Sequence, residues 1–165
     1  MLRARVRCLY EQALLLGDTK VGRQFARRVA TIREAAHGPV SLDILGTLRE
    51  ELVGSETVAR AESGRAEWCA AAILRAHAVL LMRQFGNATV PRAEALLLQS
   101  LDIARRQEAH AWVLRASTSL ACLWRGQGKT AAARDLLADS YNWFSEGFAT
   151  ADLSRASFLL KSMGN

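Results

Sequence analysis

Gly128-Lys129-Thr130 precedes an expected helix and resembles the end of a phosphate-binding loop. Such a loop needs another glycine five residues before Gly128, because its backbone N–H groups must turn inward around the phosphate. That position is Leu123, and the segment follows an expected helix rather than a strand. We therefore expect a turn between two helices here and no bound nucleotide.

Histidine and glutamate candidates for metal binding or acid–base chemistry are also scattered. His37, His77 and His110 are far from one another and from any Cys/His cluster, whereas a metal site needs several ligands at close spacing. Glu50 and Glu51 are adjacent, so on a helix their carboxylates point to different sides. We expect no metal ligand among these residues.

Serine and cysteine candidates for nucleophilic chemistry likewise have no partners. Ser117 and Ser119 have no base in a recognisable motif. Cys8, Cys69 and Cys122 are odd in number and form no CxxC pair, which argues against a disulfide framework and a zinc site. We interpret them as free, buried thiols in a reducing cytoplasm. The sequence predicts no catalytic residue and no cofactor, so we do not expect an enzyme.

The composition indicates an all-α fold. Of the 165 residues, 50% are hydrophobic and 23% are charged, which is typical of a globular chain. Alanine and leucine, both strong helix formers, dominate, and runs of strand-forming residues are missing. No apolar run reaches membrane-spanning length, and the Arg-rich start lacks the apolar stretch of a secretory signal. We therefore expect a cytoplasmic location.

Apolar periodicity and helix breakers predict about eight helices. They are expected at residues 2–16, 19–36, 41–64, 67–84, 91–107, 110–125, 130–144 and 150–164. Ser41 and Thr150 are the expected caps of the third and eighth helices, and Gly54-Ser55 is an expected break within the third. Pro91 suits a first helical turn, where its missing N–H needs no partner.

A 40-residue repeat relates the later helices. Residues 93–101 match residues 133–141 with small, large and small side chains at the same spacing, a pattern that lets two helices pack closely. Each of these helices follows another helix that ends in a glycine turn, so the pattern indicates stacked hairpins. The expected packing residues are Ala78, Ala93, Leu97, Ser100, Ala121, Trp124, Ala133, Leu137 and Ser140.

This spacing resembles the tetratricopeptide repeat, and residues 120–140 follow that pattern more closely than residues 74–100 do. The resemblance implies stacked antiparallel hairpins in a right-handed solenoid, in which residues 63–165 hold the repeats and a C-terminal capping helix. Residues 1–62 match the motif poorly, and we interpret them as degenerate or capping hairpins of the same continuous domain. Such an array typically binds a protein or peptide.

A second resemblance covers residues 56–163. It is carried by Ala59-Arg60-Ala61-Glu62, Glu67-Trp68-Cys69, Ala93-Glu94-Ala95, the stretch 101–107, Ser119-Leu120-Ala121, and above all the stretch 143–153. These segments are similar to the C-terminal helical tail of bacterial adenylate/guanylate cyclase-type and related predicted ATPase signalling proteins. The chain departs from the pattern near Ala70, Ala71 and Ala78. The resemblance implies a regulatory or sensor segment, and no catalytic activity of that family is carried by a residue here.

Basic residues concentrate at the N-terminal end. Residues 1–40 hold eight Lys or Arg against three acidic residues, while residues 41–165 hold 14 against 13. A basic end favours acidic or nucleic-acid partners. The candidate partner-binding residues are Arg23, Arg27, Arg28, Arg105 and Arg106. We favour a non-catalytic scaffold for a protein or peptide partner. Such a scaffold is compatible with a chain that forms oligomers. The alternatives are binding of nucleic acid or an acidic partner through the N-terminal helices, a cryptic enzyme, and a gene remnant without independent function.

Aromatic side chains gather toward the C-terminus. They are Trp112, Trp124, Trp143, Phe144 and Phe148. Repeat arrays use aromatic residues to fill their cores, so we expect these side chains in the core. The alternative is that some of them are exposed and anchor a partner.

Overall fold

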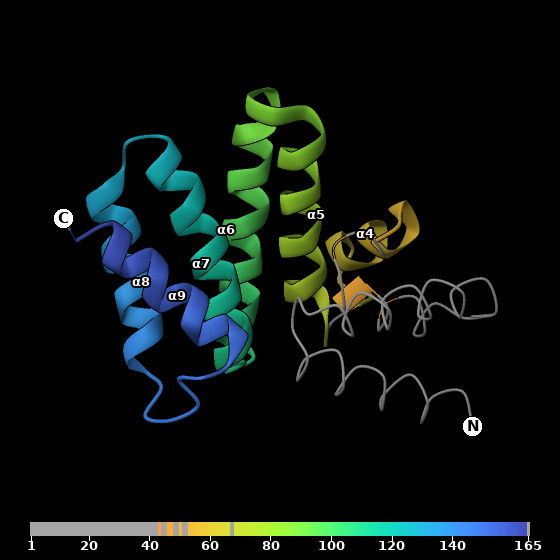
Figure 1. Cartoon of the computed structure of the whole chain (residues 1–165). Coiled ribbons are helices and arrows are strands. Elements are labelled where there is room, and N and C mark those ends of the chain that lie inside the picture. Colours follow the sequence, from red (N-terminus) through yellow and green to blue (C-terminus); the bar gives the residue numbers. More distant parts are fainter. Residues whose placement is uncertain (1–42, 44–45, 48–49, 51–52, 67, 165) are drawn as a thin grey trace, which may run out of the picture. The chain divides into compact units, whose positions relative to one another are not determined.

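The computed structural model describes residues 43, 46–47, 50, 53–66 and 68–164, and these residues form helices and connecting turns without a strand. The α-helices are α4 (Ser55–Glu62), α5 (Ala70–Phe85), α6 (Val90–Arg106), α7 (His110–Gly126), α8 (Thr130–Asn142) and α9 (Ala151–Ser162), with the 3-10 helix η2 (Gly86–Thr89) between α5 and α6 (Figure 1). The all-α prediction is confirmed for this part of the chain. The expected helices 2–16 and 19–36 and the expected cap Ser41 lie outside it.

The later helices begin at a nearly constant spacing. α5 begins at Ala70, α6 at Val90, α7 at His110, α8 at Thr130 and α9 at Ala151. One helix and its connection therefore occupy about 20 residues, and two of them account for the 40-residue repeat in the sequence.

The ends of α6 and α7 share one turn geometry. In both, one N–H donates to the carbonyl five residues earlier and the preceding N–H donates to the carbonyl three residues earlier. The pairs are Ala109 to Ala104 and Glu108 to Arg105 after α6, and Lys129 to Trp124 and Gly128 to Arg125 after α7, all at 2.9–3.0 Å. This is the Schellman motif, which satisfies the last carbonyls of a helix and needs one residue of positive φ. Gly128 provides it with φ 79° and Glu108 with φ 54°.

Two expected helix starts can be compared directly with the structure. Pro91 lies in the first turn of α6, as predicted. Thr150 occupies the N-cap position of α9 with extended backbone, but its side chain makes no capping hydrogen bond. The position of this cap was therefore predicted correctly, but the hydrogen bond by which threonine would cap the helix is absent.

The chain divides into two compact units, Met1–His77 and Ala78–Asn165. In the first unit, α4 buries Thr57, Val58 and Ala61. The buried carboxylate of Asp43 accepts a hydrogen bond from Arg60 Nη2 at 2.9 Å, so this pair ties residue 43 to α4. The predicted division of one continuous domain into capping hairpins (1–62) and repeats (63–165) stays a prediction.

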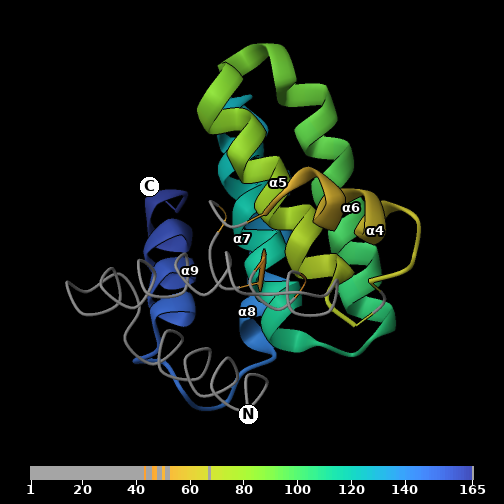
Figure 2. The ribbon, with the colours of Figure 1, turned by 90° about the vertical axis from the view of Figure 1, so that its right-hand side faces the viewer.

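The second unit is built by successive helices that pack against their neighbours. α7 packs against α6, α8 and α9, and α8 also packs against α9 (Figures 1 and 2). The core between α7, α8 and α9 consists of Leu114, Ala121, Ala133, Leu137, Leu153, Ala156, Leu159 and Met163. Its alanines let the helix backbones approach closely, and its leucines fill the space between them. Within the described residues, no helix is long and apolar enough to cross a membrane.

Candidate functional site

Eight of the nine predicted packing residues are buried, and Trp124 is partly buried against the core. The structure brings Ala121, Ala133 and Leu137 together in the core between α7, α8 and α9. Ser140 lies beside it, and its hydroxyl is 2.7 Å from the hydroxyl of Ser117 on α7. The remaining four are buried outside this cluster. They are Ala78, Ala93, Leu97 and Ser100.

Glu94 joins α6 to the turn between α7 and α8. Its carboxylate accepts hydrogen bonds from the indole N–H of Trp124 at 2.6 Å, from Gln127 Nε2 at 3.1 Å and from Lys129 Nζ at 3.3 Å. The hydrogen bond from Trp124 is the main reason why the pKa of Glu94 lies below its ordinary value. The lysine of the Gly128-Lys129-Thr130 segment therefore has a partner on α6.

Replacing Glu94 by glutamine should make stability less dependent on pH. A carboxyl whose pKa is lowered in the folded state stabilises the fold above its unfolded pKa, and this contribution is lost as the pH falls through the folded pKa. We expect Glu94→Gln to lose about 1 kcal/mol at pH 7, a charged hydrogen-bond contribution reduced by solvent, and to show a smaller further loss on acidification. Urea unfolding at pH 7 and at lower pH measures both quantities.

Glu146→Gln is the matched control for this variant. Glu146 is exposed, and it has no hydrogen-bond or ion-pair partner in the described part of the chain. Its replacement should leave the pH dependence of unfolding unchanged. Parallel curves for Glu94→Gln and the wild type would show that Glu94 contributes nothing through its charge.

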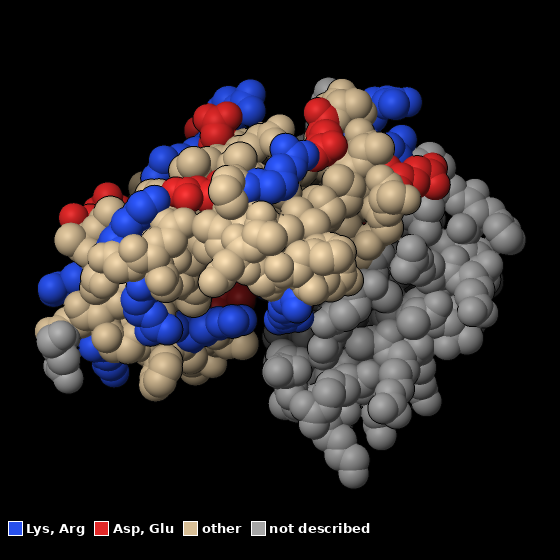
Figure 3. All heavy atoms as spheres, turned by 90° about the horizontal axis from the view of Figure 1, so that it is seen from above, with Lys and Arg blue, Asp and Glu red and all other residues tan. Residues whose placement is uncertain are grey.

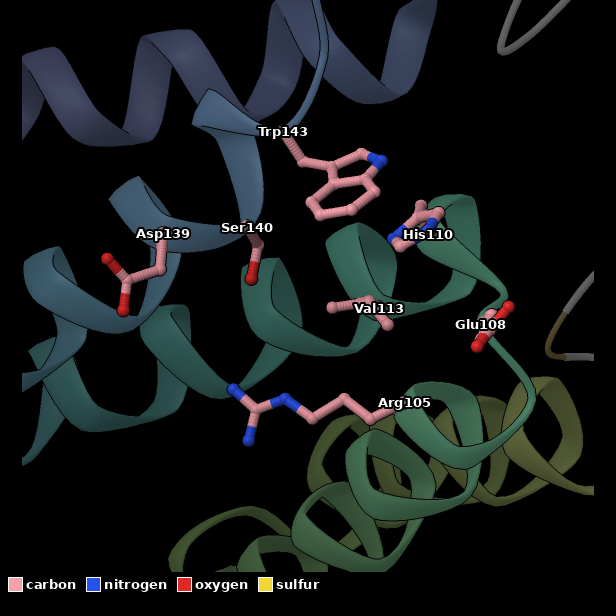
Figure 4. Close-up of a pocket in the computed structure, with 7 residues that line it drawn as sticks. All are labelled: Arg105, Glu108, His110, Val113, Asp139, Ser140 and Trp143. Carbon is pink, nitrogen blue, oxygen red and sulfur yellow. The ribbon is translucent and has the colours of Figure 1, made fainter.

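A pocket of about 260 Å³ opens where the end of α6, the start of α7 and the end of α8 meet (Figure 4). The rings of His110 and Trp143 are stacked beside it, with centroids 3.9 Å apart and an interplanar angle of 16°. The lining residues are Arg105, Glu108, His110, Val113, Asp139, Ser140 and Trp143. The pocket therefore combines an aromatic pair, one aliphatic side chain, a hydroxyl and groups of both charges.

The charged side chains of this pocket have no partner among the described residues. Arg105, Glu108 and Asp139 make no side-chain hydrogen bond or ion pair within the part of the chain that the structure describes. Arg106, in contrast, pairs with Asp102 on the exposed surface of α6 at 3.0 Å. Of the predicted partner-binding arginines, two lie in the described residues: Arg105 lines the pocket and Arg106 does not. The other three, Arg23, Arg27 and Arg28, lie outside the described residues.

Acidic and basic side chains are interspersed over much of the described face in Figure 3. Figure 3 shows Lys and Arg beside Asp and Glu over the upper part of the face in view, and a group of mostly basic side chains below it. Many charges of both signs therefore have a neighbour of opposite sign. The unpaired charges around the pocket differ from this arrangement.

The predicted core position was wrong for two aromatic residues. Trp143 is 65% exposed and Phe148 is 47% exposed, whereas Phe144 packs against the core. The reason is that α8 ends at Asn142 instead of continuing to residue 144. Trp143 therefore lies in the connection to α9, as Phe148 does, and the use of aromatic residues in the cores of repeat arrays does not extend to this connection.

The prediction of buried thiols was wrong for Cys122. Cys69 is buried, and burial raises the pKa of its thiol to about 12, so it stays protonated. Cys122 is exposed on α7. It follows Ala121, which faces the core, and one residue turns a helix by about 100° toward solvent. Cys8 lies outside the described residues.

No family model, no curated protein and no solved structure matches this chain. Within the described residues, no group of three His, Cys, Asp or Glu side chains could hold a metal ion. The function must therefore be argued from the arrangement of the second unit and its pocket.

Proposed function

We propose that this chain is a non-catalytic helical-repeat scaffold that binds a segment of a partner protein. In this proposal, about eight helices form stacked antiparallel hairpins of a right-handed solenoid. Two observations support the arrangement: the helices recur about every 20 residues, and α7 packs against α6, α8 and α9. A solenoid requires this pattern, because each hairpin buries its apolar face only against its neighbours.

The pocket between α6, α7 and α8 is the observation that carries the binding proposal. Tryptophan and arginine are enriched at positions that dominate protein–protein interfaces, because both combine a large apolar surface with polar groups. Here Trp143 is largely exposed while stacked on His110, and Arg105 is unpaired in the described structure. The aromatic stack limits the motion of the indole. The Trp143 side chain would therefore lose little conformational entropy when a partner binds.

The biological setting is part of the same proposal. The similarity of residues 56–163 to the helical tail of cyclase-type and ATPase signalling proteins supports a regulatory segment in the cytoplasm. The basic residues 1–40 favour the alternative of an acidic or nucleic-acid partner bound outside the pocket. These two alternatives differ in whether the residues of the pocket contact the partner.

A random peptide library displayed on phage tests the binding proposal. We expect selection on the full chain to yield peptides that bind in solution, and we expect Trp143→Ala to weaken them about tenfold or more, as for a central interface residue. Phe158→Ala is the control, since Phe158 is 75% exposed and does not line the pocket. Failure to select any peptide, or equal binding to both variants, would overturn the proposal.

A further inference from the structure

Two equivalent turns differ in the residue that carries the positive φ. The turn after α7 uses Gly128, where an added β-carbon would meet nothing within 4 Å. The turn after α6 uses Glu108, whose φ of 54° makes it the only non-glycine residue with positive φ among those described. A β-carbon disfavours this conformation because it approaches the following carbonyl oxygen. Glycine would therefore suit the α6–α7 turn better than glutamate does.

In the described part of the chain, the hydrogen bonds of the Schellman motif hold the backbone of Glu108 in this conformation without help from its side chain. Its side chain is exposed and has no hydrogen-bond or ion-pair partner there. The same side chain lines the pocket, on the side of His110 (Figure 4). Residues in sparsely populated backbone conformations cluster at binding and active sites, so such a residue motivates a functional hypothesis. At Glu108 the exposed group is a negative charge at the edge of the pocket.

The residues that line the pocket together with Glu108 favour a cationic ligand. The indole of Trp143 is stacked on His110, yet it remains 65% exposed. The exposed indole surface can attract a guanidinium or ammonium group through its π electrons, most strongly in tryptophan. Arg105 extends toward the opposite side of the pocket, where Asp139 also lies (Figure 4). The positive charge of Arg105 opposes the attraction of a ligand cation to the carboxylate of Asp139, which leaves Glu108 as the favoured acidic group.

We propose that Glu108 and Trp143 bind a basic side chain, arginine or lysine, of the partner segment. The proposal rests on the proposed function, since it names the chemistry that the same pocket recognises. The carboxylate of Glu108 accepts hydrogen bonds from the ligand cation, and the indole of Trp143 covers its apolar stem. On the other side of the pocket, Arg105 donates hydrogen bonds to a carbonyl or carboxylate of the same segment.

Four capped pentapeptides provide the test, each with glycine at the outer four positions and arginine, lysine, norleucine or glutamate at the centre. Titration of the 15N-labelled full chain should move the indole N–H signal of Trp143 and the amide signals of Glu108 and His110 with the arginine and lysine peptides. The norleucine peptide should not move them. The Glu108→Gln variant keeps the backbone strain and removes the charge, so its affinity should fall about fivefold or more.

Thermal unfolding separates the role of the side chain from its effect on the fold. Glu108→Gly should raise the midpoint by roughly 2–4 °C because it relieves the strain, while it abolishes the response to the arginine peptide. Gly128→Glu should lower the midpoint and leave that response intact. If Glu108→Gln binds the arginine peptide as the wild type does, the proposal is overturned.

The remaining outcomes are also decisive. A response to the glutamate peptide alone would overturn the proposal and favour an acidic partner held by Arg105. No response to any pentapeptide would overturn recognition of a single basic side chain. Library peptides that depend on Trp143 but contain no preferred basic residue would leave the scaffold proposal standing and reject this inference alone.

Discussion

Leu137→Ala should lower the free energy of unfolding by about 2–5 kcal/mol, because it removes a buried side chain and leaves a cavity. Leu137 is 0% exposed and belongs to the core in which α7, α8 and α9 meet. The remaining side chains come from three helices, so the site cannot collapse by moving one of them. This loss is a large fraction of the stability of an ordinary domain. Urea unfolding followed by circular dichroism measures it.

Leu98→Ala makes the same chemical change at an exposed position. Leu98 follows the buried Leu97 on α6 and is 44% exposed, so its truncation should change the free energy of unfolding by less than about 1 kcal/mol. The far-ultraviolet spectrum of both variants should remain helical before unfolding. Similar losses in Leu98→Ala and Leu137→Ala would show that the second unit does not have the core described for it.

Helix starts could be predicted from the sequence because local signals decide them. Pro91 fixes the start of α6, and the glycine turn before Thr130 fixes the start of α8. The match between Ala93 and Ala133 predicted two positions without room for a larger side chain, and both are fully buried. In each case, the residues of one helix and of the turn before it were enough for the prediction.

The candidate pocket could not be predicted in this way, because its residues come from the ends of three helices. Arg105 was named for its charge, whereas Glu108 and Asp139 carried no signal by themselves. Their place in one pocket depends on the tertiary contact that brings α8 beside the α6–α7 turn. One sequence signal was available: Glu108 lies two residues before a helix start, as Gly128 does 20 residues later.

The error at Trp143 also arises at the end of a helix. Trp143 was expected in the core because repeat arrays fill their cores with aromatic residues and because the helix was expected to continue to residue 144. The end of α8 at Asn142 places Trp143 in the connection to α9 instead. Its exposed fraction then reflects a position in a connection. The pattern of residues identified the helix correctly, but the last turn of a helix is where such a pattern is least informative.

Ala133→Leu tests the packing of the hairpins by adding side-chain volume to the core, whereas Leu137→Ala removes volume from it. Ala133 is 0% exposed in the core between α7, α8 and α9. A leucine there must push helices apart or adopt a strained rotamer, which costs about 1–3 kcal/mol. The thermal midpoint should fall by several degrees, at roughly 2–4 °C per kcal/mol for a chain of this size. Differential scanning calorimetry measures this change.

Ala132→Gln and Ala93→Leu turn this result into a test of the 40-residue repeat. Ala132 is exposed and lies about 100° around α8 from Ala133, so glutamine there should change stability by less than about 0.5 kcal/mol. Ala93 is the repeat equivalent of Ala133 on α6 and is also 0% exposed, so Ala93→Leu should destabilise as Ala133→Leu does. If Ala132→Gln were as harmful as Ala133→Leu, the helix register would be wrong. If Ala93→Leu were harmless, the two hairpins would not share one packing geometry, and the solenoid that underlies the proposed scaffold would lose its support.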